Sequence, residues 1–324
     1  MKRFGALISF VALAFTAVYL SSNGAAEAAT KMKMVVFGPP SLGAFLPPVI
    51  EEKKLDEKNG LDIEFVVRPP SAYNAQFNSG EFKLGGSAAL LSLANAKTRG
   101  VNVVYLFNIF DYFGVVVTDK PNIKTLKDLE GKTMAAATAT TNYVMFRWLA
   151  GKQGVDTSKI NVVNTAPPGL IGYMLAGRAD AVQMWEPAYT VLNSKKAGLH
   201  ILDLKIKSQW SSFASSSRIP YLGVAAHADW AKENSAHIPA LVQTYKDAAA
   251  WILGNPDAAA KIIAARIKGG DAGVIAGLIG NKERLALEVV PSSQLKTEIN
   301  AVFKAGIDLG YLKKLPDASI IYSK

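Results

Sequence analysis

Short apolar runs alternate with amphipathic segments along most of this chain, and the alternation stops once and then begins again. Up to residue 118, strand-like runs are separated by helix-like segments, and residues 121–131 then form a polar connection. From residue 133 the same strand–helix order restarts. Such alternation is typical of α/β sheets, and its restart within 324 residues predicts two α/β units rather than one.

The second unit is predicted to interrupt the first. One more apolar strand is expected at residues 221–226, and the whole sequence after it reads as helical. Two crossing segments, near 117–119 and near 221–225, would therefore join two lobes, and the C-terminal helices would return to the first. A cleft between such lobes buries a ligand on both faces when they close. The predicted parts are a leader at 1–28, a first lobe at 29–117 and 224–324, and a second lobe at 118–223.

The first residues have the pattern of an export signal. Lys2 and Arg3 precede an apolar run at 4–20, and Ala26-Glu27-Ala28 matches the small-x-small cleavage pattern. A membrane anchor is the alternative, because the run is about as long as a short membrane span. We expect cleavage near Ala28 and a periplasmic protein. Since no cysteine follows the signal, we expect no lipid anchor.

The amino-acid composition excludes several kinds of site. The chain has no cysteine, which removes disulfides, thiolate zinc sites, iron–sulfur clusters and cysteine nucleophiles. No two of its three histidines lie four residues apart, so the H-E-x-x-H motif is absent. The net charge of +10 is spread in runs no longer than two, as on solvated helix faces. We expect no metal, no cofactor and no nucleic-acid partner.

Two strand-to-helix turns carry polar groups at the place where open α/β sheets bind ligands. Ser87 and Ala88 follow two glycines at the end of one strand, and Ser87 is also expected to cap the next helix. Thr140, Thr141 and Asn142 stand in the corresponding turn of the second unit. Helix N-termini offer free N–H groups that favour an oxyanion. Ordinary helix capping is the alternative interpretation of each turn.

A third turn, Trp185-Glu186-Pro187, ends the strand predicted at 180–184. There Glu186 would accept hydrogen bonds from an amino group, and Trp185 would pack on a planar or methylene part of a ligand, worth roughly 0.5–1.5 kcal/mol. The alternative is that Glu186 complements the helix dipole and Trp185 belongs to the core.

An aromatic segment lies just before the first predicted crossing. Asn108 and Asp111 interrupt its apolar run, which implies partial exposure. We therefore expect Phe110 and Tyr112, with Asn108 beside them, to face the cleft.

Several of these segments occur in an order that resembles a known family. Residues 80–86 and 94–100, the connection 126–132, and residues 175–181 running into Trp185-Glu186-Pro187 resemble the extracytoplasmic substrate-binding proteins of ABC importers. The group in question handles aliphatic sulfonates, taurine and nitrate, and it includes binders of the pyrimidine precursor of thiamine. The resemblance covers essentially the whole chain after the signal. It implies an α/β type II periplasmic-binding-protein fold, with two lobes, two hinge strands and a central cleft.

The resemblance also implies partners and contacts. A small-molecule ligand is captured by lobe closure and delivered to a cognate permease in the inner membrane. In this sequence the ligand would lie against Ser41 and Gly43 after the first strand, and against the three turns described above. One departure is Lys83-Leu84-Gly85-Gly86, where many relatives have an aspartate-containing pattern.

The candidate groups are neutral donors plus one carboxylate, which suits an amino-sulfonate, an aliphatic sulfonate or an amino-pyrimidine. Nitrate or an aromatic acid is the alternative ligand. An enzyme on the same fold is the alternative class. The fungal pyrimidine synthase carries a cysteine-rich signature that this chain lacks, and no acidic pair indicates a carboxylate hydrolase. We therefore expect a monomeric binding protein and not an enzyme.

Overall fold

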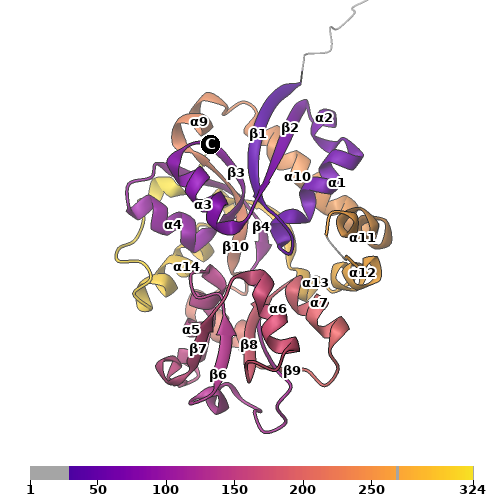
Figure 1. The fold of residues 1–324 in the computed structure, drawn as a ribbon. Coiled ribbons are helices and arrows are strands. Elements are labelled where there is room, and N and C mark those ends of the chain that lie inside the picture. Colours follow the sequence, from indigo (N-terminus) through magenta and orange to yellow (C-terminus); the bar gives the residue numbers. More distant parts are fainter. Residues whose placement is uncertain (1–28, 268–269, 324) are drawn as a thin grey trace, which may run out of the picture.

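The structure is a computed structural model that describes residues 29–267 and 270–323. The predicted signal peptide, residues 1–28, lies outside the described residues. Within the described ranges, no helix is both long enough and apolar enough to cross a bilayer. The chain forms two α/β lobes, each with its own sheet, one above the other in Figure 1.

The first sheet has six strands in the order β11-β4-β10-β3-β1-β2. Its centre is mixed, because β1 runs parallel to β2 and β3 whereas β10 runs antiparallel to β3 and β4. The strands are β1 (Thr30–Phe37), β2 (Leu61–Arg68), β3 (Leu84–Ala89), β4 (Val103–Asp111), β10 (Pro220–His227) and β11 (Leu287–Pro291).

Helices from both ends of the chain cover this first sheet (Figure 1). The N-terminal ones are α1 (Leu46–Lys53), α2 (Leu55–Lys58), α3 (Pro70–Ser79) and α4 (Leu90–Thr98). The C-terminal ones are α9 (Ala228–Glu233), α10 (Ile238–Gly254), α11 (Pro256–Ala265), α12 (Ala272–Gly280), α13 (Lys282–Leu285) and α14 (Lys296–Asp308). The chain returns to the first lobe after the second, so the first sheet contains strands from both parts of the sequence.

The second sheet has five strands in the order β7-β6-β8-β5-β9. Its strands are β5 (Gly114–Thr118), β6 (Thr133–Ala136), β7 (Asn161–Asn164), β8 (Ala181–Trp185) and β9 (His200–Leu202). The helices between them are α5 (Thr141–Lys152), α6 (Pro167–Leu175), α7 (Ala188–Lys195) and α8 (Ile206–Ala214). Strand β6 pairs in parallel with β7 and β8, as strand–helix–strand units require.

The structure corrects two sequence expectations about these sheets. The region after residue 226 is not entirely helical, because β11 adds an antiparallel edge strand beside β4. The chain changes sheet between β4 and β5 and again between α8 and β10, slightly before the predicted crossings in each case. The exact lobe limits at 117 and 223 stay a prediction.

An ion pair ties the two crossings together. Asp111 ends β4, and Arg218 lies in the segment that leads into β10. Their side chains meet at 2.9 Å from Nε of Arg218 to Oδ2 of Asp111. Burial raises the pKa of the Asp111 carboxyl, and the neighbouring guanidinium opposes that rise. The two chain segments on which the lobes meet are therefore held to each other.

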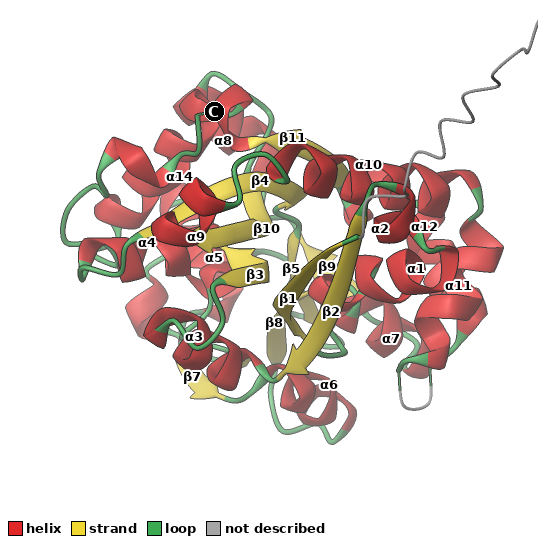
Figure 2. Cartoon of the chain, turned by 90° about the horizontal axis from the view of Figure 1, so that it is seen from above, coloured by secondary structure: helices red, strands yellow, loops and turns green. Residues whose placement is uncertain are grey.

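The lobes also share apolar packing on one side. Helix α5 of the second lobe packs against α14, and its Trp148 is buried against Trp210 and Phe213 of α8. The Trp148 indole donates a hydrogen bond to Asp308 of α14 at 3.2 Å. One face of the second sheet thus belongs to the same hydrophobic core as the first lobe, whereas its other face has a separate small core. Figure 2 shows α5, α4 and α14 together on one side of the molecule.

Candidate ligand-binding site

A pocket of about 90 Å³ lies between the lobes. It stands at the carboxyl ends of strands β1 and β8 and at the N-termini of α3, α5 and α6, the usual ligand position in open α/β sheets. Both lobes contribute to it. Its lining residues are Phe37, Gly38, Pro39, Pro40, Ser41, Pro70, Asn74, Ala89, Ser92, Ala139, Thr140, Thr141, Pro167, Pro168, Trp185 and Tyr221.

The chemistry of this lining is apolar and uncharged. Five prolines and three aromatic residues form half of the lining, and serine, threonine and asparagine supply most of the polar groups. None of the lining residues is a lysine, arginine, histidine, aspartate or glutamate. Any charge on a ligand would therefore have to be met by hydrogen bonds and helix dipoles rather than by a charged side chain.

Four of the residues predicted from the sequence line this pocket: Ser41, Thr140, Thr141 and Trp185. The hydroxyls of Ser41 and Thr140 are already used within the protein. Ser41 accepts the N–H of Gly43 at 3.2 Å, and Thr140 caps α5 by accepting the N–H of Tyr143 at 3.3 Å. The Thr140 hydroxyl also donates to the carbonyl of Ala137 at 2.8 Å.

Thr141 differs from its neighbour. It is the first residue of α5, it lines the pocket, and its side chain is only 2% exposed. Its hydroxyl has no hydrogen-bond partner among the described residues. A buried hydroxyl without a partner costs stability, which leaves this group as a candidate for a hydrogen bond to a ligand.

Gly43, Ser87 and Ala88 lie behind the pocket rather than in its lining. Ser87 does not cap a helix, because β3 continues to Ala89 and α4 begins at Leu90. Its hydroxyl accepts the N–H of Phe37 at 2.9 Å. Gly43 packs so closely on Ser87 that a Cβ at this position would overlap the hydroxyl. Ser87 and Gly43 thus hold the end of β1 at Phe37 and the start of the loop that carries Ser41.

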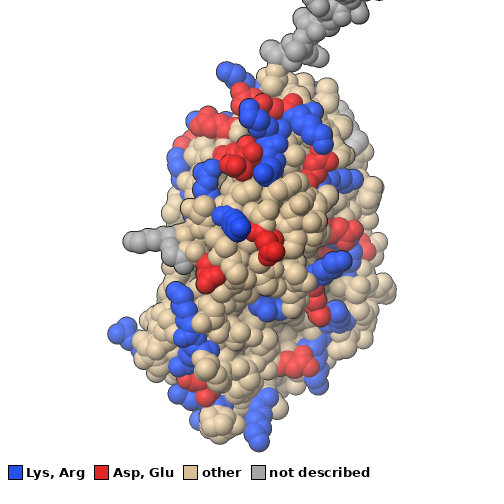
Figure 3. Space-filling view, turned by 90° about the vertical axis from the view of Figure 1, so that its right-hand side faces the viewer, with Lys and Arg blue, Asp and Glu red and all other residues tan. Residues whose placement is uncertain are grey.

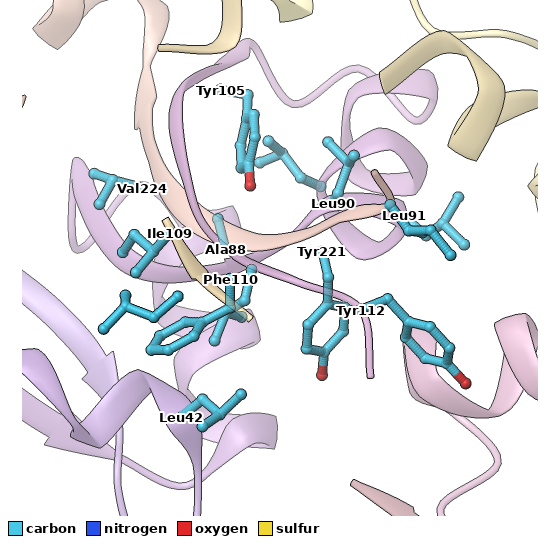
Figure 4. Packing of buried hydrophobic residues seen from close by; sticks show 14 of the residues in the cluster. Leu42, Ala88, Leu90, Leu91, Tyr105, Ile109, Phe110, Tyr112, Tyr221 and Val224 are labelled. Carbon is cyan, nitrogen blue, oxygen red and sulfur yellow. The ribbon is translucent and has the colours of Figure 1, made fainter. Parts of the chain in front are cut away.

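The aromatic segment is more buried than its sequence suggests. Phe110 is 1% exposed and Tyr112 is 4% exposed, so the predicted partial exposure is wrong for both. Asn108, which prompted that prediction, is itself buried and accepts hydrogen bonds from Tyr105 at 2.8 Å and from the N–H of Tyr221 at 3.1 Å. In Figure 4, Phe110 points toward Leu42, and Tyr112 stands beside Tyr221.

Tyr221 is a pocket residue that the sequence analysis did not identify. The side-chain amide of Asn142, which is fully buried, donates to its hydroxyl oxygen, and the Tyr112 ring packs edge-on against it at 6.0 Å. Burial raises the pKa of Tyr221, so its hydroxyl keeps its proton and remains a donor. Asn142 and Tyr112 therefore support Tyr221 from behind, without lining the pocket themselves.

The structure gives Glu186 a different role from the one expected. Its side chain is 1% exposed and forms an ion pair with Arg284 of α13, whose Nε donates to Oε1 at 2.7 Å. The second carboxylate oxygen accepts the N–H of Thr190 at 3.0 Å. Arg284 also binds the Thr190 hydroxyl and lies 4.7 Å from the centroid of the Tyr189 ring. Glu186 thus joins the second lobe to a C-terminal helix of the first.

The sequence analysis missed Arg284 and the prolines at 39, 40, 70, 167 and 168. Arg284 lies 98 positions from Glu186, and no local pattern reveals their contact. The prolines did carry a signal, because Pro39-Pro40 and Pro167-Pro168 both follow a strand. Paired prolines at two strand ends, one in each predicted unit, would have pointed to the pocket.

A larger space, here called the rear groove, lies between edge strands β9 and β11. Its volume is about 670 Å³, and Ile201, Leu204 and Leu287 are among its apolar lining residues. Lys207 and Glu283 form a largely exposed ion pair of 2.8 Å between its two sides. In Figure 2, β11 and α8 lie at the opposite edge of the molecule from α3 and α6, which border the pocket. The rear groove is therefore separate from the pocket.

The basic excess does not gather into a patch on the face shown in Figure 3. Lysine and arginine side chains are interspersed there with aspartate and glutamate. Many charges of the described residues are paired, such as Lys33 with Glu64 at 3.0 Å and Lys54 with Glu57 at 3.1 Å. Exposed pairs of this kind contribute little to stability and indicate solvated helix and strand faces.

Comparison with known proteins places this architecture. A family model described as NMT1/THI5 like matches residues 52–259. The chain is 22% identical over 229 residues to a protein of Brucella abortus (strain 2308) described as a "putative binding protein", covering 70% of this chain and 68% of that protein.

Two solved structures share the fold. One is the periplasmic aliphatic sulphonate binding protein SsuA from Escherichia coli, with a TM-score of 0.71, 18% identity and coverage of 90% of this chain and 96% of that one. The other is the alkanesulfonate-binding protein SsuA from Xanthomonas axonopodis pv. citri bound to MOPS, with a TM-score of 0.73, 16% identity and coverage of 90% and 98%. The predicted type II periplasmic-binding fold is confirmed.

Proposed function

Because the chain belongs to the NMT1/THI5-like family, we propose that it is the extracytoplasmic solute-binding component of an ABC importer. The observation that carries this proposal is the uncharged pocket between the lobes, whose lining includes Thr141, a residue with a buried and unpartnered hydroxyl. A small organic solute would bind there, lobe closure would bury it, and a cognate permease in the inner membrane would receive it. The signal-like residues 1–28 support export to the periplasm. We expect the protein to act as a monomer.

The pocket supports binding rather than catalysis. A general acid or base must lie within hydrogen-bond reach of the reacting group, and the lining supplies no histidine, lysine or carboxylate for that role. A serine or threonine nucleophile needs an adjacent base, which the lining also lacks. The nearby carboxylate of Glu186 is engaged by Arg284 and Thr190. These features favour a binding protein over an enzyme on the same fold.

A thermal-shift screen tests the proposal. A solute at one hundred times its dissociation constant adds about 2.7 kcal/mol to the unfolding free energy. For a chain of this size, with an unfolding entropy of about 0.6 kcal/mol per degree, the melting temperature should rise by about 4 °C. The panel contains alkanesulfonates, taurine, nitrate, amino-pyrimidines and small aromatic acids.

Two variants locate any response. Trp185→Ala removes a pocket wall and should abolish the shift, whereas Ile201→Ser changes the rear groove and should leave it intact. A shift that Ile201→Ser abolishes and Trp185→Ala preserves would place the solute elsewhere. If no solute of the panel raises the melting temperature, the binding function proposed for this pocket is wrong.

Transport is tested in cells. Deletion of the gene should lower uptake of the solute identified by the screen, and the wild-type gene should restore it. A gene carrying Trp185→Ala should fail to restore uptake although its protein is exported in normal amounts. Normal uptake after deletion would contradict the role in import.

A further inference from the structure

The pocket has one polar end, formed by the start of α5. In the first turn of a helix the N–H groups have no partner within the helix, and here Thr140 takes up the N–H of Tyr143. The N–H of Thr141, a lining residue, therefore remains for another acceptor. The hydroxyl of the same residue is buried and has no partner among the described residues. A backbone donor, a hydroxyl and a positive dipole end together form a receptor for an oxyanion.

The rest of the pocket is apolar. Phe37, Trp185 and Tyr221 and the proline pairs surround the space beyond the α5 N-terminus. An apolar cavity of 150 Å³ holds benzene, so a pocket of about 90 Å³ favours a short alkyl chain as the body of a ligand and sets a single ring as the upper limit. The polar end and the apolar walls thus match a solute with an acidic head and a small apolar body.

The pocket offers no anionic partner to an ammonium ion. The lining contains no carboxylate, and both oxygens of the nearby Glu186 are held by Arg284 and Thr190. Burying an ammonium ion without a carboxylate beside it costs more than burying a neutral group, and the positive end of α5 would repel it. An amino group should therefore weaken binding rather than strengthen it.

We propose that the pocket selects a small organic monoanion, a sulfonate or carboxylate with an apolar body, and discriminates against the same molecule with an amino group. Thr141 is the residue that receives the anionic head. This inference rests on the proposed function and narrows it, because it separates simple sulfonates and carboxylates from taurine-like zwitterions and from amino-pyrimidines.

Calorimetric titration of the full chain after signal removal tests the proposal with two matched solutes. Propane-1-sulfonate and taurine have the same number of heavy atoms and differ in a terminal methyl group against an ammonium group. The expected result is that propane-1-sulfonate binds about 100-fold or more tightly than taurine. Benzenesulfonate should also bind more tightly than taurine. Benzyl alcohol, which lacks the charge, should bind at least tenfold more weakly than benzenesulfonate.

Three threonine variants test the head-group site. Thr141→Val keeps the shape of the side chain and removes the hydroxyl, so it should weaken both sulfonates about tenfold or more. Thr141→Ser keeps the hydroxyl and should retain affinity, which separates a lost contact from a damaged fold. Thr138→Val is the control, because Thr138 lies in the same loop, bonds Asn164 at 2.9 Å and stands outside the lining.

The outcomes distinguish this inference from the function on which it rests. Taurine or an amino-pyrimidine binding as tightly as propane-1-sulfonate overturns the selectivity and leaves the binding function standing. Equal affinities for Thr141→Val and Thr138→Val overturn the role of Thr141. If neither sulfonate binds, the proposed solute class is wrong, and the thermal-shift screen decides separately whether the pocket binds any solute.

Discussion

Replacing Arg284 by glutamine should destabilise the protein far more than an ordinary surface change. The Glu186 side chain is 1% exposed and would lose the guanidinium that donates to it at 2.7 Å. Removing one partner of a buried ion pair costs about 3–5 kcal/mol, because a buried charge is left uncompensated. Arg284 is 24% exposed and the Thr190 N–H remains on the carboxylate, so we expect a loss near the lower end, about 3 kcal/mol.

The matched control is an exposed ion pair made by the same short helix, α13. Lys207 pairs with Glu283 of α13 at 2.8 Å, but these side chains are 71% and 61% exposed. Lys207→Gln should therefore cost less than about 1 kcal/mol. Urea unfolding followed by circular dichroism gives both free energies of unfolding. The two values can be compared if both variants show the same slope of unfolding free energy against urea concentration.

A double variant completes this test. Glu186→Gln added to Arg284→Gln removes the stranded charge and should restore part of the lost stability, as coupled neighbours do. The reasoning is refuted if the unfolding free energies of Arg284→Gln and Lys207→Gln differ by less than about 1 kcal/mol, since the buried carboxylate would then not depend on its partner.

Three further changes have expected outcomes. Gly43→Ala should lower the unfolding free energy by about 1–3 kcal/mol in urea titrations, because the added Cβ displaces the Ser87 hydroxyl from its bond to the Phe37 N–H, whereas Gly151→Ala, with open space around it, should not. Hydrogen bonds to the Asp128 carboxylate, first from the N–H groups of Lys124 and Thr125, hold its pKa below the ordinary 3.8. Its contribution is therefore present above about pH 3.8 and is lost as the pH falls from that value through the lower pKa of the folded state. The gap in urea midpoint between wild type and Asp128→Asn should shrink over that range, and a constant gap would contradict this assignment. Trp185→Phe should weaken propane-1-sulfonate in calorimetric titrations by less than tenfold, and Trp185→Ala by more, since the ring supplies contact area; equal losses would argue against a packing role.

The two-lobe fold was predictable because strand–helix alternation is a local property of the sequence. The α5 start at Thr141 follows from its capping threonine, and the pairing of β6 with β7 and β8 follows from the strand–helix–strand order. Strand β11 was not predictable in the same way. It is a five-residue edge strand between helices, and its existence depends on pairing with β4, about 180 positions earlier.

The site was only partly predictable, for the same reason. Ser87 reads as a helix cap, but β10 pairs with β3 as far as Ala89 and keeps the backbone extended. Asn108 reads as an exposed interruption, yet it is buried because Tyr105 and Tyr221 satisfy its oxygen. Glu186 reads as a ligand contact until Arg284, from a distant helix, is placed beside it. For each of these residues the sequence indicated a polar role, but a hydrogen-bond or pairing partner from a distant part of the chain determined what that role is.

The most direct test of the account is a crystal structure of the protein with propane-1-sulfonate. We predict that the sulfonate oxygens lie within about 3 Å of the Thr141 hydroxyl and of the Thr141 N–H at the start of α5, with the alkyl chain against Trp185. A sulfonate bound in the rear groove between β9 and β11, with the space between the lobes holding only water, would contradict the account.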